Sequence, residues 1–149
     1  MFRSLLFAIA FTFASQAIAE PQIMSAPDAA SAVDAGEMIL IDIRTPGEWS
    51  DTGVASGAIA LTMHSPEFGR KITELLAAQQ DKTIGLICAT GGRTEYVVSL
   101  LAENGYENVI DVSEGMMGNG RGPGWIARGM PLVTAAAAQE AYEDLVQER

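Results

Sequence analysis

The chain has 149 residues, of which 48% are hydrophobic and 19% are charged. This length suits one domain, and the hydrophobic fraction is enough to bury a core, which excludes a wholly disordered chain. Nine Lys and Arg stand against nineteen Asp and Glu, a formal net charge of −10, which argues against nucleic acid or an anionic membrane surface as a partner. A single Cys and a single His exclude an internal disulfide, a multi-cysteine zinc site and a histidine-cluster metal site.

The first nineteen residues are typical of a secretory signal peptide. Arg3 gives a positive start, Leu5 to Phe13 form an apolar stretch, and Ala17-Ile18-Ala19 fits the small-residue cleavage pattern. The apolar stretch is short for a membrane span, which needs about 20 residues, so cleavage is favoured over a permanent anchor. We therefore expect a signal peptide at 1–19 and a single domain at 20–149. The protein would be exported, to a bacterial periplasm, with no stable membrane anchor after cleavage.

Strand patterns and helix patterns alternate along the rest of the chain. In chain order we expect an edge strand at Gln22–Met24, a helix from Ser25 to Gly36, strands at Met38–Ile43 and Ala58–Met63, a helix opening at Ser65–Glu67, a strand at Thr83–Cys88, a helix at Thr94–Asn104, a strand at Asn108–Val112 and a helix after Thr134. The inner strands are nearly continuous apolar runs, typical of strands buried on both faces. The alternation predicts an α/β domain with a mainly parallel sheet and helices on both faces.

Two of these helices have an apolar face at helical spacing. The inward side chains predicted for the first are Phe68, Ile72, Leu75 and Leu76, and for the second Tyr96, Val97, Leu100 and Leu101. In parallel sheets of this kind, ligands bind beyond the carboxyl ends of the strands. Three segments follow strands at that end and are candidates for the site: 42–49, 88–94 and 113–125.

The sequence around Cys88 predicts a nucleophile. Cys88 ends an apolar strand, and a short loop leads from it into a helix: Ala89, Thr90, Gly91, Gly92, Arg93 and Thr94. The glycines let the backbone curl, so that loop N–H groups and the positive end of the helix dipole can converge on the sulfur. Such a cradle for anions favours thiolate over thiol and stabilises an anionic sulfur adduct. The alternative, a small buried hydrophobe, fits this position less well.

Several motifs, in the right order, resemble rhodanese-like domains. Residues 88–94 resemble the family's active-site loop Cys-x-x-Gly-x-Arg-Ser/Thr, and residues 42–49 resemble its Asp-x-Arg-x-x-x-Glu-aromatic motif. The remaining matches are Gly57–Ile59, Gly105–Val109, Glu114–Met116 and Trp125–Pro131. The resemblance covers nearly all of 20–149. It implies a sulfurtransferase with a five-stranded parallel sheet and a persulfide on Cys88.

This resemblance implies a covalent cycle that needs no metal and no other cofactor. Cys88 would take a sulfane sulfur from a small, thiosulfate-like donor and pass it to a thiol or to cyanide. The alternative is a persulfide carrier or protein-binding module, whose acceptor is another protein and whose small-molecule turnover is poor. A phosphatase or arsenate reductase ranks lower. Relatives of that kind place five residues between Cys and Arg, whereas four lie between Cys88 and Arg93.

The charges around the loop leave the sulfur donor open. Thiosulfate-using members of the family often carry basic residues where this chain has Ala89 and Thr90, so Arg93 is the one cation within the loop. Arg121, in a glycine-rich stretch, is the candidate to supply the missing charge; otherwise it is a solvated loop residue.

Further charged and aromatic residues receive structural interpretations. Asp42 and Arg44 end a buried strand, and we expect a supporting role for them, as an ion pair or a brace for the loop, which Glu48 would join. Trp49, Trp125, Met116 and Met117 are expected to pack in the core or line the pocket, and His64 to lie in a surface turn.

Overall fold

The main sheet has five parallel strands. The structure is a computed structural model that describes residues 22–147, so the predicted signal peptide at 1–19 lies outside the described residues. The sheet order is β1-β6-β5-β2-β4, with β1 at Gln22–Met24, β2 at Met38–Asp42, β4 at Ala58–Ala60, β5 at Thr83–Ile87 and β6 at Val109–Val112. A small antiparallel pair joins β3 (Val54–Ala55) to β7 (Leu132–Val133). The predicted α/β fold with a mainly parallel five-stranded sheet is confirmed.

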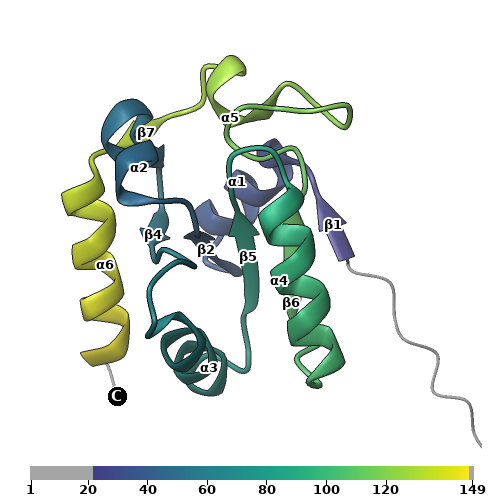
Figure 1. Cartoon of the computed structure of the whole chain (residues 1–149), viewed down its shortest axis with the longest axis vertical. Helices are drawn as coiled ribbons and strands as arrows, with labels where there is room; N and C mark the ends of the chain where they lie inside the picture. The colour runs from purple at the N-terminus through teal and green to yellow at the C-terminus, as the bar shows by residue number, and fades with distance from the viewer. Residues whose placement is uncertain (1–21, 148–149) are drawn as a thin grey trace, which may run out of the picture.

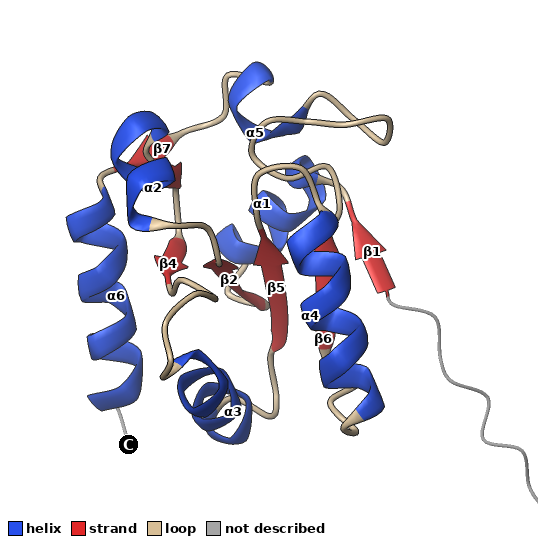
Figure 2. Cartoon of the chain, viewed as in Figure 1, coloured by secondary structure: helices blue, strands red, loops and turns tan. Residues whose placement is uncertain are grey.

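Helices cover both faces of this sheet (Figures 1 and 2). Helices α3 (Phe68–Ala78) and α4 (Gly92–Glu103) lie in front of it in Figure 1, and α1 (Ala26–Asp34) lies behind. The short helices α2 (Pro46–Thr52) and α5 (Gly124–Ala127) lie at the end toward which β5 points, and α6 (Ala135–Gln147) packs beside the edge strand β4. No helix within residues 22–147 is long and apolar enough to cross a membrane.

The core follows from the alternation of side chains along the strands. Ile39 and Ile41 of β2 belong to the cluster that α3 and α4 cover, whereas Met38 and Leu40 belong to the cluster under α1. All four are at least 93% buried. Because full burial of such a side chain contributes about 1.5–3 kcal/mol, each layer contributes substantially to stability. The sheet is therefore a rigid base for whatever its strand ends carry.

The structure contains a helix that the sequence pattern does not predict. Between β2 and β4 the chain forms α2, which begins with a capping box: Thr45 accepts a hydrogen bond from the Glu48 N–H, and the Glu48 carboxylate accepts one from the Thr45 N–H. Pro46 suits the first turn because its missing N–H is not needed there. Trp49 is the one residue that this helix buries, so the sequence has no apolar stripe that would predict a helix here. The capping box is its one sequence signal.

The prediction for the inward face of the second helix is partly wrong. Tyr96 is 63% exposed and Leu100 is 45% exposed, whereas the buried stripe of α4 consists of Thr94, Val97, Val98 and Leu101. The stripe has proper helical spacing but is rotated by one residue from the predicted one, since Val98 takes the inward place assigned to Leu100. Tyr96 and Leu100 instead line a groove of about 470 Å³ beside α3, together with Met63, Phe68 and Tyr106.

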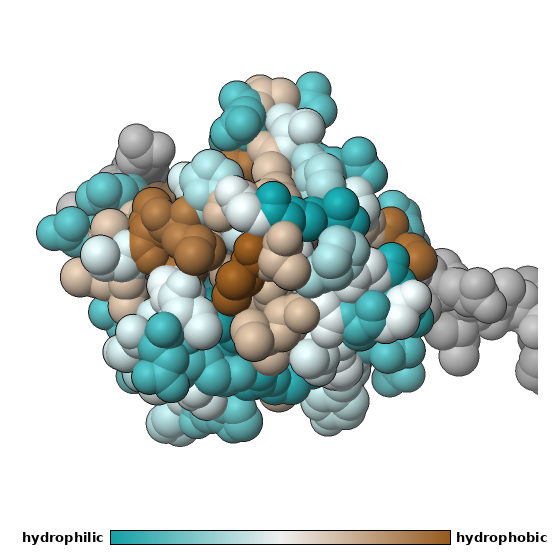
Figure 3. Space-filling model, turned by 90° about the horizontal axis from the view of Figure 1, so that it is seen from above, coloured by the Kyte–Doolittle hydropathy of each residue, from teal (hydrophilic) through white to brown (hydrophobic). Residues whose placement is uncertain are grey.

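The strand ends gather at one end of the molecule. β2, β5 and β6 are parallel neighbours, so Asp42, Cys88 and the chain after Val112 all reach this end. Figure 3 looks onto it from above and shows hydrophilic and hydrophobic residues side by side rather than one uniform surface. Any site at the strand ends is therefore assembled from three separate segments, as the sequence predicts.

Candidate active site

Cys88 lies at the centre of this end. It directly follows β5, the middle strand of the sheet, and its side chain is only 1% exposed. Gly91 has a left-handed backbone, with φ of 89°, and α4 begins at the next residue, Gly92. The turn from strand to helix is therefore as tight as the two glycines suggest. The sulfur lies where a parallel α/β sheet places its ligands.

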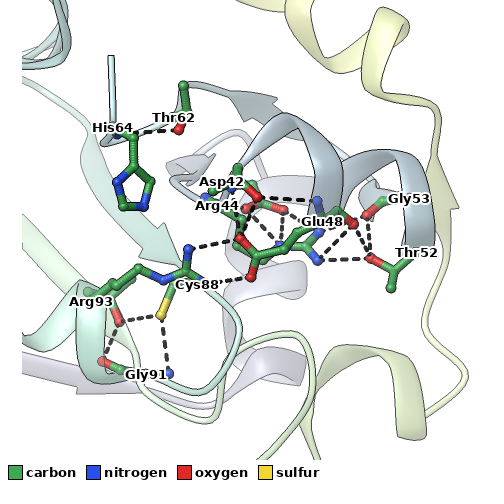
Figure 4. Close-up of polar contacts among 12 residues, drawn as sticks. Asp42, Arg44, Glu48, Thr52, Gly53, Thr62, His64, Cys88, Gly91 and Arg93 are labelled. Atoms are coloured by element: carbon green, nitrogen blue, oxygen red, sulfur yellow. Dashed lines mark hydrogen bonds and ion pairs between the residues drawn. The ribbon is translucent and has the colours of Figure 1, made fainter. Parts of the chain in front are cut away.

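Two groups of the loop contact the sulfur directly (Figure 4). The Gly91 N–H donates to Cys88 Sγ at 3.2 Å, and Thr94 Oγ1 lies 3.7 Å from the same sulfur. The Thr94 hydroxyl also donates to the Gly91 carbonyl at 2.8 Å, which closes the turn. Of the N–H groups predicted to form the cradle, that of Gly91 is the one that donates to the sulfur in the described structure. An anionic sulfur is stabilised by such a donor.

The segment after β6 fastens the other side of the loop through the backbone. The Cys88 and Ala89 carbonyls accept hydrogen bonds from Met116 and Met117 N–H, both at 2.8 Å. The Asn119 side-chain amide donates to the Thr90 carbonyl at 2.8 Å and to the Ser113 carbonyl at 2.7 Å. A Cβ on Gly91 would overlap the Ser113 carbonyl, so glycine is required there by both space and backbone angle.

Arg93 reaches toward the segment after β2. Its guanidinium makes two hydrogen bonds with the Glu48 carboxylate, at 2.9 and 2.6 Å, and Figure 4 shows it beside Cys88. The hydrogen bond from Arg93 is the main reason why the pKa of Glu48 falls from 4.5 to about 2; burial opposes this shift, and Thr45 assists it. Glu48 in turn raises the pKa of Arg93. The loop's cation is thus held in place and already partnered.

Asp42 and Arg44 form the ion pair that the sequence predicts. Arg44 donates to both carboxylate oxygens of Asp42 at 2.7–3.0 Å, and both side chains are at least 99% buried. The same guanidinium donates to the Thr52 hydroxyl at 2.8 Å and to the Gly53 carbonyl at 2.7 Å. Arg44 therefore ties the end of β2 to the far end of α2. Since α2 also carries Glu48, this pair supports the position of Arg93 without contacting the sulfur.

Arg121 points to a carboxylate rather than to the loop. Its guanidinium lies 3.8 Å from Asp111 Oδ2, and its side chain is 49% exposed. The glycine-rich stretch that carries it begins beside Asn119, whose own N–H and carbonyl pair with Gly122. A direct role for Arg121 toward a sulfur donor stays a prediction.

Glu114 is a buried residue of this end whose structural role the sequence does not predict. It is 2% exposed, and its carboxylate accepts hydrogen bonds from the N–H groups of Ala26 and Gly124 and from the Arg128 side chain. Burial raises the pKa of Glu114, but these donors outweigh burial and hold it below its usual range. Glu114 thereby joins the starts of α1 and α5 to the segment that fastens the loop. Its sequence signals are an acidic residue two positions after a buried strand and its place in the segment Glu114–Met116 that resembles the family.

The remaining candidates lie mostly where the sequence predicts. Met116, Trp49 and Trp125 are at least 98% buried, and His64 is exposed. Met117 is the exception, because 55% of it is exposed. Residues 22–147 contain no cluster of three or more His, Cys, Asp or Glu side chains that would hold a metal ion. The chemistry available to the site is therefore that of one sulfur nucleophile, a backbone donor, a hydroxyl and a fixed guanidinium.

Comparisons with known proteins agree with this geometry. A protein of Allochromatium vinosum named sulfurtransferase is 27% identical over 100 residues, covering 67% of this chain and 82% of its own. An uncharacterized protein of Rickettsia prowazekii is 26% identical over 98 residues, covering 62% and 80%. The solved thiosulfate sulfurtransferase of Pseudomonas aeruginosa shares the fold with a TM-score of 0.60 at 17% identity, over 84% of this chain and 24% of that one. The family model of the rhodanese-like domain matches residues 25–119, and the chain belongs to that family.

Proposed function

We propose that the protein is a sulfurtransferase that carries sulfane sulfur as a persulfide on Cys88. The observation that carries the proposal is the placement of this sulfur. It sits in a tight strand-to-helix turn, with the Gly91 N–H donating to it at 3.2 Å and the Arg93 guanidinium beside it. A backbone donor of this kind stabilises a sulfur that carries negative charge, as a persulfide does. The family and the sulfurtransferase relative support the same chemistry.

The cycle has two displacement steps. In the first, the Cys88 thiolate attacks the outer sulfur of thiosulfate; a new S–S bond forms, the old one breaks, and its electron pair leaves with sulfite. In the second, cyanide or a thiolate attacks the outer sulfur of the persulfide, and the electron pair of the broken S–S bond returns to Cys88. Neither step uses a metal ion or another cofactor. The part of the protein is to hold the sulfur and to stabilise its negative charge.

The test is intact-mass spectrometry of the reduced protein, residues 20–149, before and after thiosulfate. We expect a gain of one sulfur atom, its loss on addition of cyanide, and no gain in Cys88→Ala. Cys88→Ser is the matched variant, because it keeps the size of the side chain while replacing the nucleophilic sulfur. Sulfur transfer by Cys88→Ser would contradict the proposal.

A second candidate, a persulfide carrier for a protein acceptor, is favoured by one observation. Arg93 is paired with Glu48 by two hydrogen bonds, and Ala89 and Thr90 add no charge, so the loop offers no unpaired cation to recruit a small anionic donor. The two candidates differ in the second step. Rapid emptying of the persulfide by cyanide or small thiols supports the enzyme, and a loaded protein that small thiols leave intact supports the carrier.

We also propose that the protein works outside the cytoplasm, in a bacterial periplasm. This rests on the signal-peptide pattern at 1–19 alone. Fractionation of cells that express the whole chain tests it. The mature protein should be recovered in the periplasmic fraction and begin at residue 20, and a variant without 1–19 should stay in the cytoplasm. Retention of the full-length chain in the cytoplasm would contradict this part of the proposal.

A further inference from the structure

The Lys and Arg side chains at the Cys88 end of the described structure are already paired. Within residues 22–147, six side chains lie between 2.6 and 3.9 Å from a carboxylate: Arg44, Arg70, Lys71, Arg93, Arg121 and Arg128. The remaining one in this range, Lys82, directly precedes β5 and so lies at the opposite end of the strand from Cys88, which follows it. A small anionic sulfur donor therefore needs a positive charge from another kind of side chain.

His64 is a side chain at this end that can carry such a charge. It lies in the turn between β4 and α3 and is exposed. Its backbone N–H donates to Thr62 Oγ1 at 3.3 Å, whereas its imidazole has no hydrogen bond or ion pair within residues 22–147. Histidine is the side chain that gains and loses a positive charge within the physiological pH range. In its charged form, His64 is a cation without a carboxylate partner in the described structure.

Backbone hydrogen bonds place the His64 turn beside the Cys88 loop. The Met63 N–H donates to the Ile43 carbonyl at 3.1 Å, and the Ile43 N–H donates to the Ile87 carbonyl at 3.0 Å. Since neighbouring strands lie about 4.8 Å apart, two such spacings, roughly 10 Å, separate the chain just before His64 from the chain just before Cys88. Met63 also packs against the buried cluster that contains Cys88.

The imidazole of His64 is directed toward the reactive sulfur. Figure 4 shows it pointing from its turn toward Arg93 and Cys88. The other charged or titratable side chains of the neighbouring elements are Glu48 of α2, Arg93 and Tyr96 of α4, Asp42 and Arg44 at the end of β2, and Glu67, Arg70 and Lys71 beside or within the first turn of α3. Each carboxylate of this set is paired with a cation of the same set. The carboxylate of Glu95, also on α4, acts on Asp111, on the β6 side of the loop.

We propose that His64, in its positively charged form, selects an anionic sulfur donor for Cys88. The outer sulfur of such a donor meets Cys88 Sγ, and its charged oxygens extend away from the loop toward the imidazolium. The imidazolium attracts the donor and donates a hydrogen bond to one of these oxygens. His64 makes and breaks no covalent bond, and its attraction for the donor is lost as the pH rises and the imidazole becomes neutral. This inference rests on the proposed function, since it assigns a chemical class to the donor of that cycle.

The first test is the rate of persulfide formation at sub-saturating thiosulfate, followed by intact-mass spectrometry at pH 6 and at pH 8.5. At pH 6 we expect His64→Gln to load about three- to fivefold more slowly than the wild type, the effect of one unit charge a few ångströms away in water-like surroundings. At pH 8.5 the two proteins should load at nearly the same rate. No loss at pH 6, or an equal loss at both pH values, would overturn the proposal.

Two further variants locate the effect. His64→Lys keeps a positive charge at both pH values, so it should load like the wild type at pH 6 and faster than the wild type at pH 8.5. Lys82→Gln is the matched control, because it removes a positive charge at the opposite end of the strand. It should load like the wild type at both pH values. A loss in Lys82→Gln equal to that in His64→Gln would mean that the net charge of the chain, and not position 64, sets the rate.

Alkylation of Cys88 separates this inference from the proposed function, because no sulfur donor takes part. Iodoacetate is an anion and iodoacetamide is neutral; both react with the thiolate, so the ratio of their rates does not depend on the thiolate fraction. At pH 6 this ratio should be about three- to fivefold higher in the wild type than in His64→Gln, and the difference should shrink in high salt.

The two readouts fail separately. If thiosulfate forms no persulfide but the alkylation ratio depends on His64, the proposed donor is wrong and the selection of anions by His64 stands. An alkylation ratio that is equal in the wild type and His64→Gln at pH 6 would overturn the inference, whatever thiosulfate does. Thermal unfolding checks that each variant is folded, as expected for substitutions of an exposed side chain.

Discussion

The two flanks of the Cys88 loop are built on different interactions. On the β2 side, ion pairs hold the structure: Asp42 with Arg44 at the strand end, and Glu48 with Arg93 across to the loop. On the β6 side, backbone hydrogen bonds, the Asn119 side chain and closely packed glycines hold the loop. The buried carboxylate there, Asp111, accepts no hydrogen bond within residues 22–147 and has the Arg121 guanidinium 3.8 Å away. Two buried aspartates, on the strands that flank β5 on its two sides, thus have different surroundings. The carboxylate of Asp42, with its full set of hydrogen bonds, acts as a brace, whereas burial raises the pKa of Asp111.

Removal of the brace should have the largest effect. Asp42→Ala leaves the Arg44 guanidinium buried without its counter-ion, and loss of one partner of a buried pair costs about 3–5 kcal/mol. Urea unfolding of the variant and the wild type measures the difference in the free energy of unfolding. A loss below about 1 kcal/mol would mean that Thr52 and Gly53 suffice to hold Arg44, and the contrast between the two flanks would be lost.

The next largest effect should come from the glycine on the β6 side. Gly91→Ala forces a Cβ into a left-handed backbone and against the Ser113 carbonyl, and we expect a loss of about 2–3 kcal/mol together with loss of persulfide formation. Gly92→Ala is the matched control, since a Cβ there meets nothing within 4 Å and φ is not positive. It should be stable to within about 0.5 kcal/mol. Equal losses in both variants would show that the close approach of residue 113 is unimportant.

The ion pair between the β2 flank and the loop should have a moderate, pH-dependent effect. Glu48→Gln removes a carboxylate that caps α2 and pairs with Arg93; because the pair is partly exposed, we expect a cost of about 1–2 kcal/mol at neutral pH. The pKa of Glu48 is lowered from 4.5 to about 2, so its contribution is present above 4.5 and is lost as the pH falls toward 2. Unfolding curves of both proteins should therefore converge over that range. A constant difference down to pH 2 would contradict the pairing.

The smallest stability effect should come from Asp111. Its pKa in the folded protein is raised, so its contribution to stability is present below the ordinary value of 3.8 and is lost as the pH rises through the raised value. At neutral pH the wild type buries a charged carboxylate, and Asp111→Asn avoids that cost. We therefore expect the variant to be as stable as the wild type or more stable by up to about 1 kcal/mol. Denaturant midpoints at several pH values above 4 measure this. Strong destabilisation would place Asp111 with Asp42 as a brace.

Much of the fold and of the loop could be predicted from sequence because each rests on a local signal. Apolar runs locate the strands of the sheet, and the Cys88–Thr94 spacing with its glycines predicts the tight turn into a helix. Asp42 and Arg44 have opposite charges and lie two residues apart at the end of one strand, and this spacing predicts that they pair. The catalytic role of Cys88 stays a prediction until persulfide formation is measured.

What sequence could not give depends on contacts between distant segments. Glu114 is bound by Ala26, Gly124 and Arg128, which lie up to 88 residues away, and nothing near it in the chain indicates them. The lack of a hydrogen bond at the buried Asp111 is likewise visible only when β6, α4 and the glycine-rich stretch are assembled. Tyr96 and Leu100 show the reverse case, because an apolar side chain at a plausible spacing is exposed when a neighbour fills the inner place.

The solitary cysteine of this chain has a consequence for timing. A protein with a second thiol nearby discharges a persulfide on itself and ends as a disulfide. This chain has no second thiol, so in the proposed cycle a loaded molecule would stay loaded until an outside acceptor arrives, and each molecule would hold a single sulfur at Cys88. The loaded fraction of the population is then set by the balance of the filling rate and the emptying rate. In the proposed cycle each protein molecule binds one sulfur atom at a time, and the fraction of loaded molecules follows the ratio of donor to acceptor availability.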